Sequence, residues 1–216
     1  MHEEAYDPVM RVKTEDHPAH EASGGRLLSW LERSLKLGGL ALLGFCSFAY
    51  LDLWMYQALS GITLLNEASR GAPRLEARTR YAEGQSMGWI EIPRLGISAI
   101  VAHGDDTRTL MRAVGHIPGT AFPGETGNVG LAAHRDTFFR DLEGIESSDR
   151  IRLVMPNQTL AYQVVDVAIV RPSRVDLLAP TPESSLTLVT CYPFQFIGSA
   201  PYRFVVRARQ IADDTD

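Results

Sequence analysis

The stretch TLVTCYPF, Thr187 to Phe194, ends an apolar run with a cysteine and continues into a loop that contains proline. Such a run is typical of a buried strand, and Pro193 and Gly198 mark the loop that follows it. Cys191 therefore lies where a strand opens into a loop, a position at which folded scaffolds commonly hold reactive groups. The alternative interpretation is that this cysteine is a small buried hydrophobic residue.

The composition bounds the class of protein. A chain of 216 residues with 45% hydrophobic and 22% charged residues is expected to hold one folded domain, with or without appendages. The net charge is -5, and the basic residues are scattered without the clustered face of a nucleic-acid binder. We therefore expect no nucleic acid partner.

The chain has two cysteines, Cys46 and Cys191, and neither belongs to a C-x-x-C pair or a Cys/His cluster with zinc-ligand spacing. The segment HPAH, His17 to His20, lies in an acidic tail without apolar periodicity, which favours a solvated tail over a metal site. We expect no structural metal and no cofactor.

A long apolar segment lies near the N-terminus. Residues 37–51 carry no charge, and the run continues to Leu59 with Asp52 and Gln57 as its chief polar interruptions. At 1.5 Å per residue, about 20 such residues cross a bilayer core of roughly 30 Å. We predict a transmembrane helix here. A buried helix of a soluble domain is the alternative, which the glycines and the missing amphipathic stripe disfavour.

The charges beside this segment predict its orientation. Arg26, Arg33 and Lys36 precede it, whereas the first basic residue after it is Arg70. This bias predicts a single-pass protein of the cell membrane with a cytoplasmic N-terminus, so membrane lipid is an expected partner. A cleaved signal peptide is the alternative, but the long charged region and the long apolar run favour an uncleaved signal anchor.

These features divide the chain into five predicted parts. They are a flexible cytoplasmic tail (1–36), the transmembrane anchor (37–59), a linker or stalk (60–86), an extracytoplasmic folded domain (87–210) and a C-terminal tail (211–216). Because Cys46 falls in the anchor, Cys191 is the only thiol of the folded domain and has no disulfide partner there. An unpaired thiol outside the cytoplasm suggests reactivity.

The folded domain has the pattern of short strands. Residues 88–101 resemble a strand pair or one bent strand, Ile151, Leu153 and Met155 alternate on one face, and Tyr202, Phe204, Val206 and Ala208 alternate on another. Helical signals are weak and short, over 105–114 and 136–145. This pattern predicts a mostly β domain that is either a small closed barrel or a sandwich.

A cysteine nucleophile reacts as the thiolate and needs a base beside it, most often histidine. The folded domain contains His103, His116 and His134. The first two lie in turn-like segments and are plausible as ordinary loop histidines. His134 ends the predicted buried strand NVGLAA, the same kind of position as Cys191, so two strands can carry both groups to one rim. The pattern leaves open whether His134, another histidine or none serves as the partner.

Arg203 is the third candidate. If the strands that contain Thr187 to Cys191 and Tyr202 to Arg209 pair as antiparallel neighbours, the end of the first and the start of the second share one edge. A guanidinium there can stabilise a thiolate, bind a carbonyl or hold an oxyanion. A solvated arginine is the alternative reading of Arg203 alone.

Together these segments resemble a known family. The sequence TLVTC, followed by a loop with proline and then by RFVV, is similar to the sortase pattern T-L-x-T-C followed by R. The segment GNVGLAAHRDTFFRDL resembles the sortase histidine segment. The resemblance runs from about Gly88 to Arg209 and keeps the order His, Cys, Arg.

This resemblance implies an eight-stranded closed β-barrel and a membrane-bound cysteine transpeptidase that cleaves an LPxTG-like sorting signal in secreted proteins. It implies Cys191 as nucleophile, His134 as acid and base, and Arg203 as the residue that positions substrate and stabilises the oxyanion. Thr190 is expected to shape the acyl pocket, and the backbone N–H of Tyr192 to be a second oxyanion donor.

The implied partners are secreted proteins with a C-terminal sorting signal and an amine acceptor, either a wall precursor or a protein lysine. Two alternatives remain. One is a hydrolytic cysteine endopeptidase, which uses water as the acceptor. The other is a catalytically inactive, membrane-anchored β-domain that binds a surface ligand and holds Cys191 as core filler.

Overall fold

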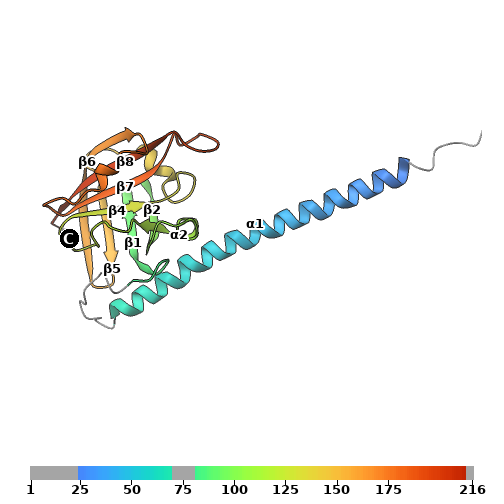
Figure 1. Cartoon of the computed structure of the whole chain (residues 1–216). Coiled ribbons are helices and arrows are strands. Elements are labelled where there is room, and N and C mark those ends of the chain that lie inside the picture. The colour runs from blue at the N-terminus through green and yellow to red at the C-terminus, as the bar shows by residue number, and fades with distance from the viewer. Residues whose placement is uncertain (1–23, 70–80, 213–216) are drawn as a thin grey trace, which may run out of the picture. The chain divides into compact units, whose positions relative to one another are not determined.

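Eight strands close into a barrel in the order β1-β2-β3-β4-β7-β8-β6-β5, which confirms the barrel that the family resemblance implied (Figure 1). The computed structural model describes residues 24–69 and 81–212. The strands are β1 (Ser86–Ile92), β2 (Ile97–His103), β3 (Val114–His116), β4 (Asn128–Ala132), β5 (Arg150–Met155), β6 (Gln158–Val170), β7 (Ser185–Tyr192) and β8 (Tyr202–Ile211). The helices are α1 (Gly24–Ser69), α2 (Thr107–Arg112) and the short 3-10 turns η2 (Pro93–Leu95), η3 (Arg140–Gly144) and η4 (Val175–Leu178).

The predicted strand pair over 88–101 is a β-hairpin. Strands β1 and β2 pair antiparallel, with Ile92 opposite Ile97. The turn between them is η2, in which Pro93 fixes the first position and Gly96 closes the turn in the left-handed region, with φ of 65°. The proline and glycine therefore separate two strands, and the bent-strand reading is wrong.

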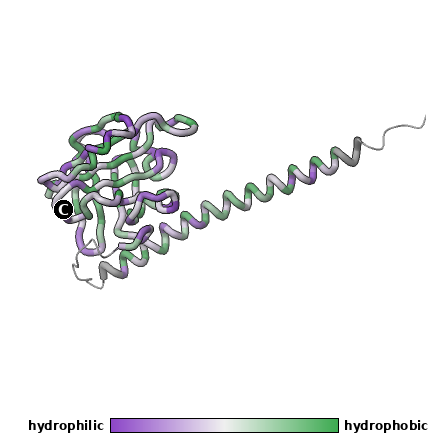
Figure 2. Tube along the Cα trace, in the orientation of Figure 1, coloured by the Kyte–Doolittle hydropathy of each residue, from purple (hydrophilic) through white to green (hydrophobic). Residues whose placement is uncertain are grey.

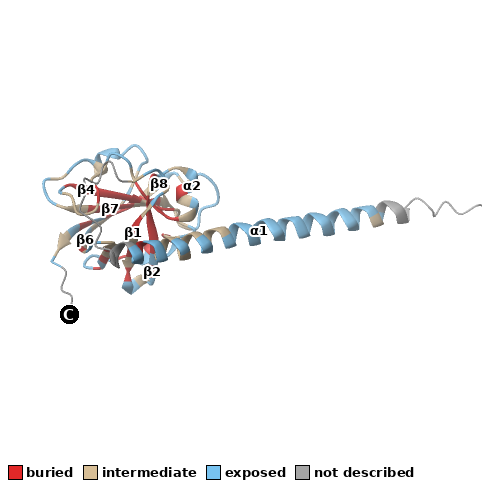
Figure 3. Cartoon of the chain, turned by 90° about the horizontal axis from the view of Figure 1, so that it is seen from below, coloured by how far each residue is buried: buried red, intermediate tan, exposed pale blue. Residues whose placement is uncertain are grey.

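Alternation along the strands fills the barrel. Ile151 and Leu153 of β5 and Phe204, Val206 and Ala208 of β8 are buried in one apolar cluster, as their period-2 spacing predicts. Figure 3 shows, in red, that buried positions lie along the strands of the barrel. Tyr202 differs: it is 43% exposed because it begins β8 at the rim, where the strand leaves the core.

Strands β4 and β7 lie side by side and run parallel, with Asn128 opposite Ser185 and Ala132 opposite Val189. Asn128 is buried and holds this end of the pair. Its side-chain amide donates to the Leu177 carbonyl at 2.9 Å, and its oxygen accepts from the Thr187 hydroxyl at 2.8 Å. The pairing fixes the register in which β4 and β7 reach the opposite rim.

Helix α1 is apolar along most of its length (Figure 2). Its residues Leu28–Asn66 have the length and composition needed to cross a membrane. The helix extends past the predicted span 37–59 at both ends, so residues 24–36 of the predicted tail and 60–69 of the predicted linker are helical. The charged pair Lys36 and Glu32, one turn apart, supports the N-terminal extension. Residues 1–23, including His17 to His20, and residues 70–80 lie outside the described residues.

The boundary between two structural units of the chain falls after Ala49. Within the second unit, the two polar interruptions of the apolar run make contacts with the barrel. Asp52 accepts two hydrogen bonds from Arg112 at 2.8 and 2.9 Å, and Gln57 accepts from the Ile100 backbone N–H at 3.0 Å. Leu64 is buried with Ile100, which explains why the helix continues into the predicted linker.

Candidate active site

Cys191 and Arg203 lie directly opposite each other. They are register partners in the antiparallel pair β7–β8, which confirms the strand pairing predicted from the sequence. Leu188 of β7 and Phe204 of β8 belong to the apolar core, so Cys191 and Arg203, at odd spacing from them, share the outer face. Both residues are half-buried. The thiol and the guanidinium thus emerge on one face of the barrel rim.

His134 reaches the same rim on the other neighbour of β7. The Ala133 backbone N–H donates to the Val189 carbonyl at 3.3 Å, and the Thr190 hydroxyl donates to the Ala133 carbonyl at 2.7 Å. The parallel register of β4 and β7 ends with Ala132 opposite Val189, two residues before His134 and Cys191. Strand β7 therefore lies between the segments that carry His134 and Arg203.

The main chain at His134 is held by a turn. The His134 carbonyl accepts from the Thr137 N–H at 3.4 Å and from the Phe139 N–H at 3.2 Å. Phe139 is fully buried and belongs to the core cluster. The predicted helical segment after the histidine is this turn followed by η3, and its buried phenylalanine anchors the histidine to the core.

The Arg203 guanidinium contacts the start of its own strand. Its Nη1 donates to the Tyr202 carbonyl at 2.9 Å and to the Ala200 carbonyl at 3.3 Å. A guanidinium carries five N–H donors. Within the described part of the chain, the remaining donors of Arg203 have no acceptor and are available to a carbonyl or an oxyanion.

The sequence of the barrel matches a known family. A sequence model of the sortase domain matches residues 90–211. The chain belongs to the sortase family. Sortase D of Bacillus subtilis (strain 168) is 33% identical over 129 residues, which cover 59% of this chain and 65% of that relative. The chain thus matches slightly less than two thirds of the relative's length.

Solved sortase structures share the fold. A Clostridium perfringens Sortase D5 transpeptidase superposes with a TM-score of 0.60 at 25% identity, over 70% of this chain and 98% of that one. Sortase C-1 from Actinomyces oris is 32% identical with a TM-score of 0.53, over 57% of this chain and 71% of that one. Family members are cysteine transpeptidases, which is consistent with the thiol at this rim.

The two residues beside Cys191 in this sortase have different surroundings. Thr190 is buried, and its hydroxyl donates to the Ala133 carbonyl. This bond links β7 to the segment that follows β4. The Tyr192 ring stacks on Phe204 with centroids 6.3 Å apart, and Phe194 meets Phe204 edge-on at 5.1 Å. Tyr192 and Phe194 thus pack against the buried Phe204 at the edge of the core, directly after the cysteine.

The other two histidines form a pair elsewhere in the sortase barrel. His103 and His116 are register partners on β2 and β3, with their Nδ1 atoms 3.1 Å apart. His116 is fully buried, its Nε2 lies 2.9 Å from the Ala121 carbonyl, and Phe122 stacks on its ring. Burial lowers the pKa of His116. Of the three histidines, only His134 lies next to the β7 rim.

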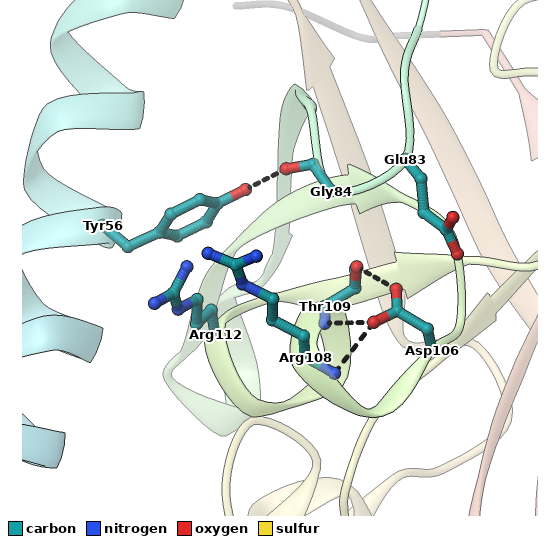
Figure 4. A pocket seen from close by; sticks show the side chains of 7 residues that line it. All are labelled: Tyr56, Glu83, Gly84, Asp106, Arg108, Thr109 and Arg112. Atoms are coloured by element: carbon teal, nitrogen blue, oxygen red, sulfur yellow. Dashed lines mark hydrogen bonds between the residues drawn. The ribbon is translucent and has the colours of Figure 1, made fainter.

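A cavity of about 470 Å³ lies away from this rim (Figure 4). It is lined by Tyr56, Glu83, Gly84, Asp106, Arg108, Thr109 and Arg112. The Asp106 carboxylate caps α2, accepting from the Arg108 and Thr109 N–H groups at 2.9 and 3.2 Å, and the Thr109 hydroxyl lowers its pKa. The Tyr56 hydroxyl donates to the Gly84 carbonyl at 2.8 Å. Most of the polar groups that line this cavity are therefore already engaged in hydrogen bonds within the fold.

The sequence did not single out Arg135, which follows His134 in this sortase. Its side chain makes three hydrogen bonds to the loop between β7 and β8. The only available signal was a basic residue next to the candidate histidine. Among the described residues, no group of three or more His, Cys, Asp or Glu side chains has the arrangement of a metal site.

Proposed function

We propose that this sortase is a membrane-anchored cysteine transpeptidase that cleaves an LPxTG-like sorting signal in secreted proteins. The observation that carries the proposal is that β7 brings Cys191 between Arg203 of β8 and the segment that holds His134. Acyl transfer through a thioester needs a thiolate nucleophile and a base beside it, and a guanidinium can supply the donor that stabilises the oxyanion.

The first step forms a thioacyl-enzyme. The Cys191 thiolate attacks the carbonyl carbon of the signal's threonine, and a C–S bond forms. The C–N bond of the scissile peptide then breaks, and His134 gives its proton to the leaving amine. Arg203 orients the carbonyl and stabilises the tetrahedral oxyanion, with the Tyr192 backbone N–H as a second donor.

The second step releases the product. An amine acceptor attacks the thioacyl carbon, His134 takes a proton from it, and the Cys191 thiolate leaves. The acceptor is a wall precursor or a protein lysine. Thr190 shapes the acyl pocket by holding β7 to Ala133 through its hydroxyl.

The proposed location is the cell membrane, with α1 as a single-pass anchor, the N-terminus in the cytoplasm and the barrel outside. Its support is the apolar length of α1 and the excess of basic residues before the apolar run. This location places the barrel on the side of the membrane that secreted proteins reach.

Product analysis tests the reaction. The full-length chain in detergent micelles is incubated with an LPxTG-type peptide library and an amine acceptor, with Cys191→Ala as control. Peptide joined to the acceptor identifies a transpeptidase. Free acid as the sole product supports the hydrolytic endopeptidase instead, and an unchanged library supports the ligand-binding β-domain.

A further inference from the structure

The loop between β7 and β8 starts two residues after Cys191. Residues 193–201 form no strand. Within the described residues, the backbone bond inside this loop runs from the Phe196 N–H to the Pro193 carbonyl at 3.3 Å. Residues 195–199 are exposed, and Ile197 is 97% exposed. An exposed loop with so few bonds of its own needs outside partners to hold one conformation.

Arg135 supplies such partners. Its Nη1 donates to the Pro193 carbonyl at 3.0 Å, and its Nη2 donates to the Phe196 and Gly198 carbonyls at 2.5 and 3.0 Å. The guanidinium carbon also lies 5.9 Å from the centre of the Phe196 ring. One charged side chain therefore holds three carbonyl oxygens and one ring of the loop.

Arg135 and Arg203 contact different parts of the loop. Arg203 holds the end of the loop through the Ala200 carbonyl, and Arg135 holds the part that begins at Pro193. Arg135 is also the chain neighbour of His134. The loop is thus tied to the two segments that flank the Cys191 thiol.

We propose that Arg135 is a positioning residue that holds the β7–β8 loop beside the Cys191 thiol and couples the loop to the segment carrying His134. The contact itself stands on the geometry alone, whereas its kinetic consequence rests on the proposed transpeptidase function. A planar guanidinium is required because it presents several donors in fixed directions, whereas a lysine ammonium is a single point.

The test compares the full-length wild-type chain in detergent with Arg135→Ala, Arg135→Lys and the matched control Arg140→Ala. Arg140 is exposed and lies in the same segment, in η3. The first readout needs no activity. Chymotrypsin can cleave the loop after Phe194 and Phe196, and the rate of this cleavage reports how often the loop opens. Mass spectrometry of the fragments measures the cleavage rate. We expect cleavage at least about tenfold faster in Arg135→Ala, intermediate in Arg135→Lys and unchanged in Arg140→Ala.

The second readout is steady-state kinetics with the signal peptide and an amine. We expect Arg135→Ala to raise KM about tenfold with a smaller change in kcat, because the loop is misplaced while the thiol and His134 remain. A far-ultraviolet circular dichroism spectrum that matches the wild type shows that the barrel is intact.

Two results would overturn the proposal. Equal loop cleavage in Arg135→Ala and wild type would refute the clamp whatever the activity. Faster loop cleavage with an unchanged KM would refute the proposed effect of the loop position on substrate binding. A wild-type chain that processes no peptide overturns the proposed function instead, and the cleavage rates still decide the clamp.

Discussion

The Thr190 hydroxyl donates to the Ala133 carbonyl at 2.7 Å. This bond joins the residue before Cys191 to the residue before His134, across the parallel pair β4–β7. Thr190 is buried, so the bond is shielded from water. The bond therefore adds to the β4–β7 ladder and to the Ala133 N–H bond to the Val189 carbonyl, just before the two candidate residues.

Replacing Thr190 with valine keeps the shape but removes the donor. The Ala133 carbonyl is then left without this partner, which we expect to cost about 1–3 kcal/mol of unfolding free energy. The shifted His134 should lower kcat by roughly tenfold or more, since small misplacements are costly in catalysis. Thermal unfolding and peptide kinetics measure the two effects.

Thr187→Val is the matched control. Thr187 lies on the same strand, is equally buried, and donates to Asn128 Oδ1 at the far end of the pair. We expect a similar loss of stability with kcat close to wild type. Equal losses of kcat in both variants would show that Thr190 acts through stability alone.

Arg203→Lys keeps a positive charge opposite Cys191 but removes the planar fork. We expect kcat to fall by about 10²–10³, the range for loss of an oxyanion donor, and Arg203→Ala to be at least as impaired. Arg207→Lys, four residues along β8 and paired with Asp166 at 2.9 Å, is the control. Wild-type kcat in Arg203→Lys would remove Arg203 from the proposed mechanism.

His116 predicts a pH dependence of stability. Its pKa is lowered chiefly by burial and further by His103, whereas the hydrogen bond to the Ala121 carbonyl and the charges of Glu125 and Asp105 oppose the shift. As pH falls through about 6.5, the unfolded chain takes up a proton that the folded chain resists, so stability falls. We expect a slope of up to about 1.4 kcal/mol per pH unit below that point.

His116→Gln tests the origin of this slope. The variant should be less stable overall, because the contacts of His116 with His103 and the Ala121 carbonyl are altered. Its unfolding free energy should nevertheless depend less on pH between about 7 and 5. Denaturant unfolding at a series of pH values gives the slope, and an unchanged slope would assign it to other groups.

The proposed orientation is tested with the two native cysteines. In intact cells, a membrane-impermeant maleimide should label Cys191 and leave Cys46 unlabelled, because only the barrel is outside. Cys46→Ser should keep the labelling and Cys191→Ala should lose it. Labelling that appears only after the cells are lysed would contradict a barrel outside the membrane.

The barrel and its rim were predictable because their signals are local. Ile151 and Leu153 alternate within a few residues, and the short connection between β7 and β8 fixes which strand ends meet. The family motifs then selected His134 among three histidines. The closed barrel itself needed the resemblance, since alternation alone fits a sandwich equally well.

What escaped prediction depends on contacts distant in sequence. The helix continues past residue 59 because Leu64 is buried against Ile100, which no local pattern reveals. His103 and His116 meet only because β2 and β3 run parallel. Arg135 finds its acceptors in a loop whose path the sequence does not specify.

The central claim is that Cys191 carries a thioacyl intermediate. Intact-mass spectrometry of the full-length chain, incubated with an LPxTG-type peptide library and no amine acceptor, tests it directly. We predict an added mass equal to the peptide cleaved after its threonine, located on Cys191, discharged by hydroxylamine and absent from Cys191→Ala. A wild-type chain that gains no such mass with any library member, or an adduct that persists in Cys191→Ala, would contradict the account.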